Sequence, residues 1–455
     1  MIKNLTEGKP LKLLFFFSLP MLMGNLFQQL YNMVDSMVVG NFVGADALAS
    51  VGASFPVVFL AIALAAGLSM GCSVVISQLF GAGHIREMKT TISTALISQF
   101  FLSIAITVVG ELIAPTVLRL LKTPDNILAD SLIYLRIYFG GAVFLFMYNT
   151  LNGVFNALGD SKTPLYYLII STLTNIVLDL LFVIRYDMGV AGVAWATLIA
   201  QGVCSILSLI TLISRIKRLE DEPGAESGEK LPLFHASAIN RIAKVGVPSM
   251  IQQSIVSVSM LMMQNLVNSY GSIYIAGYTA ATKIDSLSMM PNMNFSNAMS
   301  SYTAQNIGAD KIERVKEGYK ANIFMVVVFS IALTLIIFLF GPYLLNLFMD
   351  SEANAQVIKY GMDYMKVVSS FYILMGIMFT SNGLLRGAGD MKFFMISSML
   401  NLFTRVAIAY TLAPKIGSIA IAWSIPAGWL VGTIISFLRF KSGKWKDAAL
   451  TKRNA

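Results

Sequence analysis

The sequence LLFFFSLPMLMGNLFQQLYNMVDSMVVGNFV, residues 13–43, is an apolar run that is long enough to cross a membrane as a helix. Its only ionisable side chains are Asp35 and Tyr31, and a tyrosine phenol is neutral at physiological pH. An aspartate at bilayer depth costs about 2.5 to 3.5 kcal/mol, and such residues face the interior of a helix bundle and mark functional sites. The run therefore predicts a first membrane helix whose buried side carries a polar site.

The rest of the chain continues this pattern. Of its 455 residues 56% are hydrophobic and 13% are charged, whereas soluble proteins carry about 25% charged residues. Cys72 and Cys204 fall within apolar runs, which favours small core residues over a disulfide or a metal site. The fold class is predicted to be an all-α membrane protein of twelve transmembrane helices. The predicted spans are centred near Leu26, Ile62, Ala105, Phe144, Ile176, Ile199, Met260, Met290, Leu333, Ile373, Leu402 and Gly428.

The Lys and Arg residues are distributed unevenly between the two sides of the predicted membrane. Of the 33, two lie within spans, 24 face the cytoplasm if the N-terminus is inside, and seven face the other side. These seven are Arg119, Lys122, Arg136, Arg185, Lys359, Lys366 and Lys415. The asymmetry predicts a multi-pass protein of the plasma membrane with both termini cytoplasmic. Because topology accounts for the net charge of +9, the basic surplus does not indicate a nucleic-acid partner.

Two halves of the sequence resemble each other. QLFGAGHIREMK (78–89) matches QNIGADKIERVK (305–316), and NGVFNALGDSK (152–162) matches NGLLRGAGDMK (382–392). Matches in the same order at a nearly constant displacement along the chain indicate an internal duplication. Because six spans separate each pair, the repeat is parallel, and a substrate site is expected between the halves.

The duplication predicts two six-helix lobes, which rock to give alternating access. Pro20 and Pro248, which share nearly the same displacement as the matched segments, lie near the start of the first span of each half. The Q-x-x-G-A and G-D-x-K segments are expected to be short cytoplasmic turns whose charges face water. The predicted parts are an N-terminal lobe (1–213), a cytoplasmic linker (214–237), a C-terminal lobe (238–440) and a basic cytoplasmic tail (441–455).

These motifs and the stretch SLPMLMGNLFQQLYNMVDSMVVGNFVGADALASVG (18–52) resemble the multidrug and toxic compound extrusion (MATE) family over essentially the whole chain. The resemblance implies an antiporter that exports cationic or amphipathic compounds in exchange for H⁺ or Na⁺. Its partners would be these small molecules and membrane lipid, and it would act as a monomer without a cofactor. A flippase of a lipid or lipid-linked precursor with the same architecture is the alternative. No nucleophile–base pattern or metal-ligand spacing suggests an enzyme.

The resemblance also implies a cation-coupling site. The branch related to the DNA-damage-inducible F proteins has an Asp on helix 1, an Asn and an Asp four residues apart on helix 5, and a Thr on helix 6. The matching residues are Asp35, Asn175, Asp179 and Thr197. Independently of the family, these groups could bind Na⁺ through oxygen atoms, or repulsion and desolvation could hold one carboxyl protonated. A structural role, in which Asp35 only hydrogen-bonds its neighbours, is the alternative.

The C-terminal half is charged differently. The acidic residues that another branch of the family carries on helices 7 and 10 are missing here. Aligning the halves instead puts Arg405 at the repeat position of Asp179, and Lys283 and Asp285 lie on the eighth predicted span. Asp285 could pair with Arg405 or Lys283, either as a structural ion pair or as part of substrate binding or gating. Lys283 and Asp285 cannot point the same way, because residues two apart lie on different helix faces.

Overall fold

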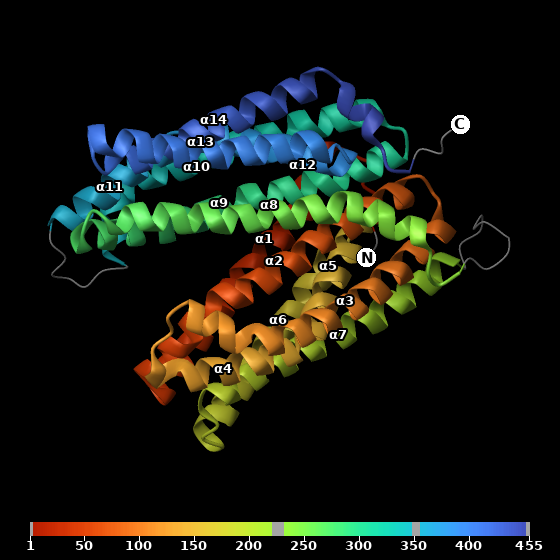
Figure 1. Cartoon of the computed structure of the whole chain (residues 1–455). Helices are drawn as coiled ribbons and strands as arrows, with labels where there is room; N and C mark the ends of the chain where they lie inside the picture. The colour runs from red at the N-terminus through yellow and green to blue at the C-terminus, as the bar shows by residue number, and fades with distance from the viewer. Residues whose placement is uncertain (1–2, 221–231, 348–354, 452–455) are drawn as a thin grey trace. The chain divides into compact units, whose positions relative to one another are not determined.

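The computed structural model describes residues 3–220, 232–347 and 355–451 (Figure 1). Much of the predicted linker and the end of the predicted tail, residues 221–231 and 452–455, lie outside the described ranges. Within them the chain forms fourteen α-helices and no β-strand. In chain order the helices are α1 (Pro10–Val38), α2 (Ala45–Gly81), α3 (Ile85–Leu120), α4 (Asp125–Gly140), α5 (Ala142–Ala157), α6 (Lys162–Leu180), α7 (Gly189–Glu220), α8 (Ala236–Asn268), α9 (Ser272–Gly308), α10 (Ile312–Asn346), α11 (Ala355–Ser369), α12 (Tyr372–Ala388), α13 (Met391–Ile416) and α14 (Ile419–Lys441).

Most of these helices are long and apolar enough to span a membrane. Among the described residues nine helices meet that requirement singly, with the π-helical turns at the ends of α1 and α6 counted as part of their spans. Two bent pairs, α4 with α5 (51°) and α11 with α12 (50°), bring the number to eleven if each pair is one broken span. The 37-residue α9 is not among them, because Ser, Thr and Asn make it more polar. With α9 included, each of the twelve predicted centres lies in a separate helix or bent pair.

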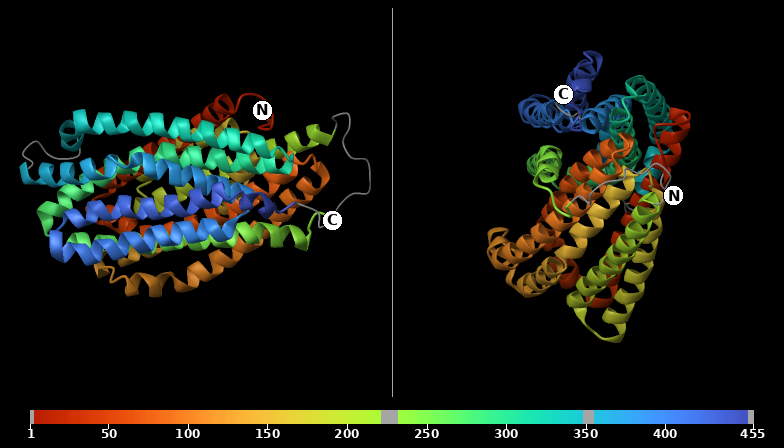
Figure 2. Two further views of the ribbon diagram at one scale, coloured as in Figure 1. Left: turned by 90° about the horizontal axis from the view of Figure 1, so that it is seen from above. Right: turned by 90° about the vertical axis from the view of Figure 1, so that its right-hand side faces the viewer.

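The chain divides into two compact units. Unit 1 comprises Met1–Asn4 and Pro20–Met250, and unit 2 comprises Leu5–Leu19 and Ile251–Ala455. The division therefore crosses α1 at Pro20 and α8 two residues after Pro248. In unit 1 α6 packs along α7, and in unit 2 α13 packs along α14 (Figures 1 and 2). Whether the predicted lobes, 1–213 and 238–440, are the parts that move during transport stays a prediction.

The residues that precede α1 and α8 form hydrogen bonds with residues in or after the two Q-x-x-G-A segments. In unit 2 the backbone N–H of Leu5 donates to Gln305 Oε1 (2.8 Å), and Lys311 Nζ donates to the carbonyl oxygen of Thr6 (3.2 Å). In unit 1 the helix that follows the first of these segments makes the related contact, in which Ser93 Oγ donates to the carbonyl oxygen of Leu233 (2.6 Å). The separation along the sequence between Leu5 and Leu233 equals that between Pro20 and Pro248, so the contact follows the repeat. The expectation that the charges of these turns face water fits Lys311, which is exposed although it is bonded, whereas the uncharged Gln305 is fully buried.

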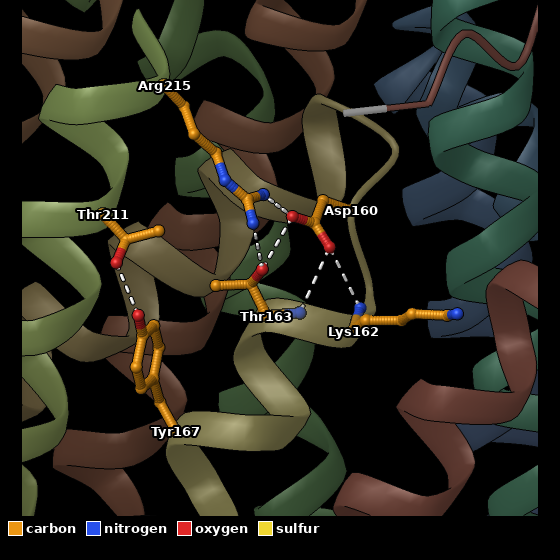
Figure 3. A network of polar contacts seen from close by, with 6 residues as sticks. All are labelled: Asp160, Lys162, Thr163, Tyr167, Thr211 and Arg215. Atoms are coloured by element: carbon orange, nitrogen blue, oxygen red, sulfur yellow. Dashed lines mark hydrogen bonds and ion pairs between the residues drawn. The ribbon is translucent and has the colours of Figure 1, made fainter. Parts of the chain in front are cut away.

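The first G-D-x-K segment departs from expectation. Asp160 accepts hydrogen bonds from the backbone N–H (3.1 Å) and the hydroxyl (2.8 Å) of Thr163 and so caps α6 (Figure 3). Arg215, near the end of α7, forms an ion pair with Asp160 and donates to Thr163 Oγ1 (2.7 Å). A further hydrogen bond between Tyr167 and Thr211 (2.5 Å) joins the same two helices. Asp160 is only 1% exposed and does not face water.

Unit 2 repeats this arrangement. Arg439, near the end of α14, donates from Nε to Asp390 Oδ2 (2.6 Å), and Asp390 immediately precedes α13. The guanidinium also lies over the ring of Phe393, 4.1 Å from its centroid. An Asp–Arg pair with a buried aspartate thus joins α6 to α7 in unit 1 and α13 to α14 in unit 2. The sequence did not predict this burial, because each arginine lies far along the chain from its aspartate.

Candidate cation-binding site

Two carboxyl groups meet inside unit 1. Asp35 is on α1 beside Val34 and Val38, which pack in the apolar core of the unit, and Asp179 is a fully buried residue of α6. The two carboxyl groups lie within hydrogen-bonding reach of each other. Among the described residues, no donor group makes a hydrogen bond to either oxygen of Asp179 or to Oδ1 of Asp35. Two ionised carboxylates have no proton to donate, so this contact is favourable only if the pair holds a proton or another cation.

The helices that carry these carboxylates both end in a π-helical turn. The turn η1 (Val39–Val43) follows α1, and η2 (Leu181–Arg185) follows α6, and the two turns contact each other. They begin four residues after Asp35 and two residues after Asp179. Such single π turns interrupt the regular hydrogen bonding of a helix and are frequent at functional sites.

Thr197 joins the site through a tyrosine. Tyr31, one helical turn before Asp35 on α1, donates its hydroxyl hydrogen to Thr197 Oγ1 of α7 (2.9 Å). Tyr134 of α4 and Tyr31 both interact electrostatically with Asp35 and with Asp179. Neither tyrosine was predicted to have a role in the site. The four-residue spacing from Asp35 could have revealed Tyr31, whereas Tyr134 has no sequence signal of its own.

Asn175 lies one turn before Asp179 on α6 and is fully buried. Neither polar atom of its side chain has a hydrogen-bond partner among the described residues. The structure therefore brings Asp35 and Asp179 together, links Thr197 to them through Tyr31, and leaves the Asn175 oxygen available on the same helix. These oxygen atoms fit a hard cation such as Na⁺ or a proton. The described residues contain no cluster of three or more His, Cys, Asp or Glu side chains that could hold a metal ion.

The predicted charge cluster of unit 2 has a different environment. Asp285 of α9 is 7% exposed, and each of its oxygens accepts a hydrogen bond from a tyrosine. Tyr372 of α12 donates to Oδ1 (2.7 Å) and Tyr364 of α11 donates to Oδ2 (3.4 Å). Lys283, two residues earlier, is exposed and lies on another face of α9.

Arg405 of α13 interacts electrostatically with Asp285 and with Tyr278 of α9. The rings of Tyr278 and Tyr364 meet edge to face with centroids 5.2 Å apart, and Tyr364 donates to Asp285. Among the described residues no ion pair joins Asp285 to Arg405, so the predicted pairing of Asp285 stays a prediction.

The two sites occupy related positions in the internal repeat. The separation along the sequence between Tyr134 and Tyr364 equals that between the two G-D-x-K segments. Tyr134 interacts with the carboxylates of unit 1, and Tyr364 donates to the carboxylate of unit 2. Asp179 and Arg405 also correspond in the alignment of the two halves. The main chemical difference is that unit 1 has a second carboxylate where unit 2 has a guanidinium.

Comparisons with known proteins support this duplication. The MatE family model matches residues 20–181 and again residues 248–411, so the two matches begin at the paired prolines of the repeat. The chain is 31% identical over 448 residues to the probable multidrug resistance protein YpnP of Bacillus subtilis, covering 98% of both chains.

Solved structures show the same fold. An outward-facing multidrug resistance MATE family transporter of the MOP superfamily is 26% identical, with a TM-score of 0.87 over 97% of this chain and 98% of that one. A MOP superfamily transporter from Pyrococcus furiosus, reported to have a binding pocket of reverse polarity, is 25% identical with a TM-score of 0.88 over the same shares. These similarities confirm the predicted all-α membrane fold of two six-helix lobes.

Proposed function

The chain belongs to the MATE family of multidrug efflux transporters, and we propose that it exports cationic or amphipathic compounds from the cell in exchange for H⁺ or Na⁺. Membership of this family of transport proteins confirms the prediction that the chain is not an enzyme. The relative named above is a probable multidrug resistance protein, which favours drug export over a lipid flippase. The transporter acts as a monomer in the plasma membrane.

The coupling cation binds at Asp35 and Asp179, with Asn175 and Thr197 completing the site. A bound cation neutralises the repulsion between the two carboxylates, and its release leaves two like charges that favour separation of α1 from α6. A positively charged substrate competes with this cation, either directly or through bending of α1 beside Pro20. Antiport needs such competition, because a carrier that bound both ligands without penalty would not couple their fluxes.

One observation carries this proposal. The two carboxyl groups interact with each other inside unit 1, and the oxygens of Asp179 are buried without a hydrogen-bond donor among the described residues. A purely structural aspartate is normally satisfied by donors, as Asp160 is by Thr163 and Arg215. An exchangeable cation is the partner that the acidic pair lacks.

Transport by purified protein in liposomes tests the proposal. Under an imposed H⁺ or Na⁺ gradient, the wild-type protein should accumulate a fluorescent cation against its own gradient. Asp35→Asn keeps the shape of the side chain but removes its charge, so it should abolish this accumulation while the protein still folds. Asp46→Asn, at an exposed acid in the first turn of α2, is the matched control and should transport normally.

The opposite result is equally clear. If Asp35→Asn accumulates the dye at the wild-type rate and with the wild-type pH dependence, Asp35 is structural and coupling lies elsewhere.

The proposed orientation places both termini in the cytoplasm. It predicts that single cysteines at residues 46 and 237, in a background without Cys72 and Cys204, are labelled by an impermeant reagent from opposite sides. Position 237 should react only from the inside, and position 46 only from the outside. Labelling of both cysteines from the outside would contradict the twelve-span topology.

A further inference from the structure

The segment Leu5–Gly8, which we call the strap, precedes α1 and is bound by unit 2. Gln305 and Asn306 of α9 are fully buried, and both form hydrogen bonds with the backbone of Leu5. The N–H of Leu5 donates to Gln305 Oε1 (2.8 Å), and Asn306 Nδ2 donates to the carbonyl oxygen of Leu5 (3.2 Å). Leu5 itself is only 1% exposed. Unit 2 thus binds both the main chain and the apolar side chain of the strap, as peptide-binding sites do.

Two basic residues bind the rest of the strap. Lys311 Nζ donates to the carbonyl oxygen (3.2 Å) and to the hydroxyl oxygen (3.1 Å) of Thr6. Arg314 of α10 donates to the carbonyl oxygen of Gly8 (2.9 Å) and, from Nε, to Asn306 Oδ1 (3.2 Å). Arg314 therefore also orients the amide that binds Leu5. We call Gln305, Asn306, Lys311 and Arg314 the strap site.

The repeat does not provide this site in unit 1. Only the glutamine is retained there, and the other three residues of the strap site are replaced by Leu79, His84 and Glu87. The counterpart of Leu5 is Leu233, which is 75% exposed. The strap site is thus a feature of unit 2 alone among the described residues.

Release of the strap would be unfavourable. It would expose the side chain of Leu5 to water and would separate the buried Gln305 Oε1 from the Leu5 N–H. Gly8 supports the bound conformation, because its φ of +86° lies in the left-handed region that glycine adopts without strain. Burial, hydrogen bonding and backbone conformation therefore all favour a strap that stays bound.

We propose that the strap site fastens the start of α1 to unit 2 at every stage of transport. From this start α1 runs into unit 1 at Pro20, and Asp35 lies on the unit 1 part of the helix. A change in the cation at Asp35 therefore acts on unit 2 through α1. This consequence rests on the proposed function, whereas the fastening itself does not.

Cross-linking tests whether the strap stays bound. Thr6→Cys and Lys311→Cys, in a background without Cys72 and Cys204, are joined by a thiol-cleavable bifunctional reagent, and uptake of a fluorescent cation is measured in liposomes. The cross-linked protein should transport at least as fast as the same protein after cleavage. If the loss of Lys311 itself slows uptake, the cross-link should restore the rate, because it replaces the lost hydrogen bonds. A cross-link that blocks uptake until it is cleaved would overturn the proposal.

Weakening the strap is the reverse test. Asn306→Leu introduces the residue that unit 1 has at this repeat position and removes a hydrogen bond to Leu5. The Leu5 N–H should then exchange with deuterium about tenfold faster, because local opening exposes it to water. Gradient-driven uptake should fall several-fold.

Gly8→Ala is a second variant that leaves the buried amides intact. An added Cβ atom would meet only Leu13, at 3.8 Å, so the substitution acts through backbone strain at φ +86° and should also speed exchange at Leu5. Lys9→Ala, at the next and exposed residue, is the matched control and should change neither exchange nor uptake.

The two measurements separate the possible failures. If exchange at Leu5 is unchanged in Asn306→Leu and in Gly8→Ala, the strap site does not hold the segment and the proposal is wrong. If exchange speeds up while uptake keeps the wild-type rate, the fastening has no part in transport, which also overturns the proposal. If the wild-type protein itself shows no gradient-driven uptake, the proposed function fails, and the exchange rates still test the fastening.

Discussion

Unit 1 and unit 2 satisfy their buried carboxylates in opposite ways. In unit 1 Asp35 and Asp179 approach each other, and the oxygens of Asp179 lack a donor among the described residues. In unit 2 Asp285 accepts from two tyrosines, and Arg405 interacts with it electrostatically. The proposed function needs a cation that comes and goes in unit 1, whereas hydrogen-bond donors of the chain satisfy the carboxylate of unit 2.

The difference shows how a duplicated scaffold can divide its tasks. Each unit keeps an Asp–Arg pair between neighbouring helices, α6 and α7 or α13 and α14, and each keeps a tyrosine at the repeat position of Tyr134. The units differ at Asp179 and Arg405, where one substitution reverses the local charge. The shared contacts join the corresponding helices of each unit, and the repeat position of Asp179 and Arg405 is where the local charge of the two units differs.

Asp179→Asn should have the largest effect on function. The variant removes half of the acidic pair, so gradient-driven uptake of a fluorescent cation in liposomes should fall to the level of protein-free vesicles. The double variant Asp35→Asn/Asp179→Asn should be little worse than either single variant, because residues that act as one unit are not additive. Additive partial losses would show that the two carboxylates act independently.

Removal of a carboxylate should change stability in opposite directions in the two units. Asp285→Ala leaves the hydroxyls of Tyr364 and Tyr372 without their acceptor, so it should lower the free energy of unfolding by about 1 to 3 kcal/mol for each hydroxyl. Asp179→Asn removes a repulsion and should leave the stability unchanged or raised. Chemical denaturation in detergent micelles measures both. Equal destabilisation by the two variants would contradict the distinction between the sites.

Loss of a single donor in unit 2 should have a smaller effect. Tyr372→Phe removes the 2.7 Å hydrogen bond to Asp285, and a hydrogen bond to a charged group contributes about 1.5 to 3 kcal/mol. Tyr360→Phe is the control, because its ring also packs among the tyrosines, 5.4 Å from Tyr274, and its hydroxyl bonds no other described residue. If both variants lower the unfolding free energy equally, the hydroxyl of Tyr372 is not what stabilises the carboxylate.

The smallest change is expected for Tyr31→Phe in unit 1. The hydroxyl of Tyr31 donates to the neutral Thr197, and such a bond contributes about 0.5 to 1.5 kcal/mol. Denaturation should therefore show a smaller loss than for Tyr372→Phe, while cation-driven uptake persists with a shifted ion dependence. Complete loss of uptake would mean that Tyr31 belongs to the essential part of the site.

Much of the fold and part of the site could be predicted from the sequence. Asp35 was found because a carboxylate in an apolar run is costly, and the repeat was found because its motifs recur at a nearly constant displacement. Tyr134 was missed because nothing in the sequence links it to Asp35. The buried ion pair of Asp160 was missed for the same reason, since Arg215 becomes its partner only when α6 packs along α7.

The contact between Asp35 and Asp179 is the central claim, and infrared spectroscopy of the carboxyl groups tests it directly. In Na⁺-free buffer near neutral pH, the purified wild-type protein should show the band of a protonated, buried carboxyl group. The band should disappear in the double variant Asp35→Asn/Asp179→Asn and should persist in Asp285→Asn, because the protonated carboxyl group belongs to the unit 1 pair. If Na⁺ is the coupling ion, its addition should also remove the band from the wild-type protein. A spectrum that is the same in the wild-type protein and in the double variant Asp35→Asn/Asp179→Asn would contradict the account.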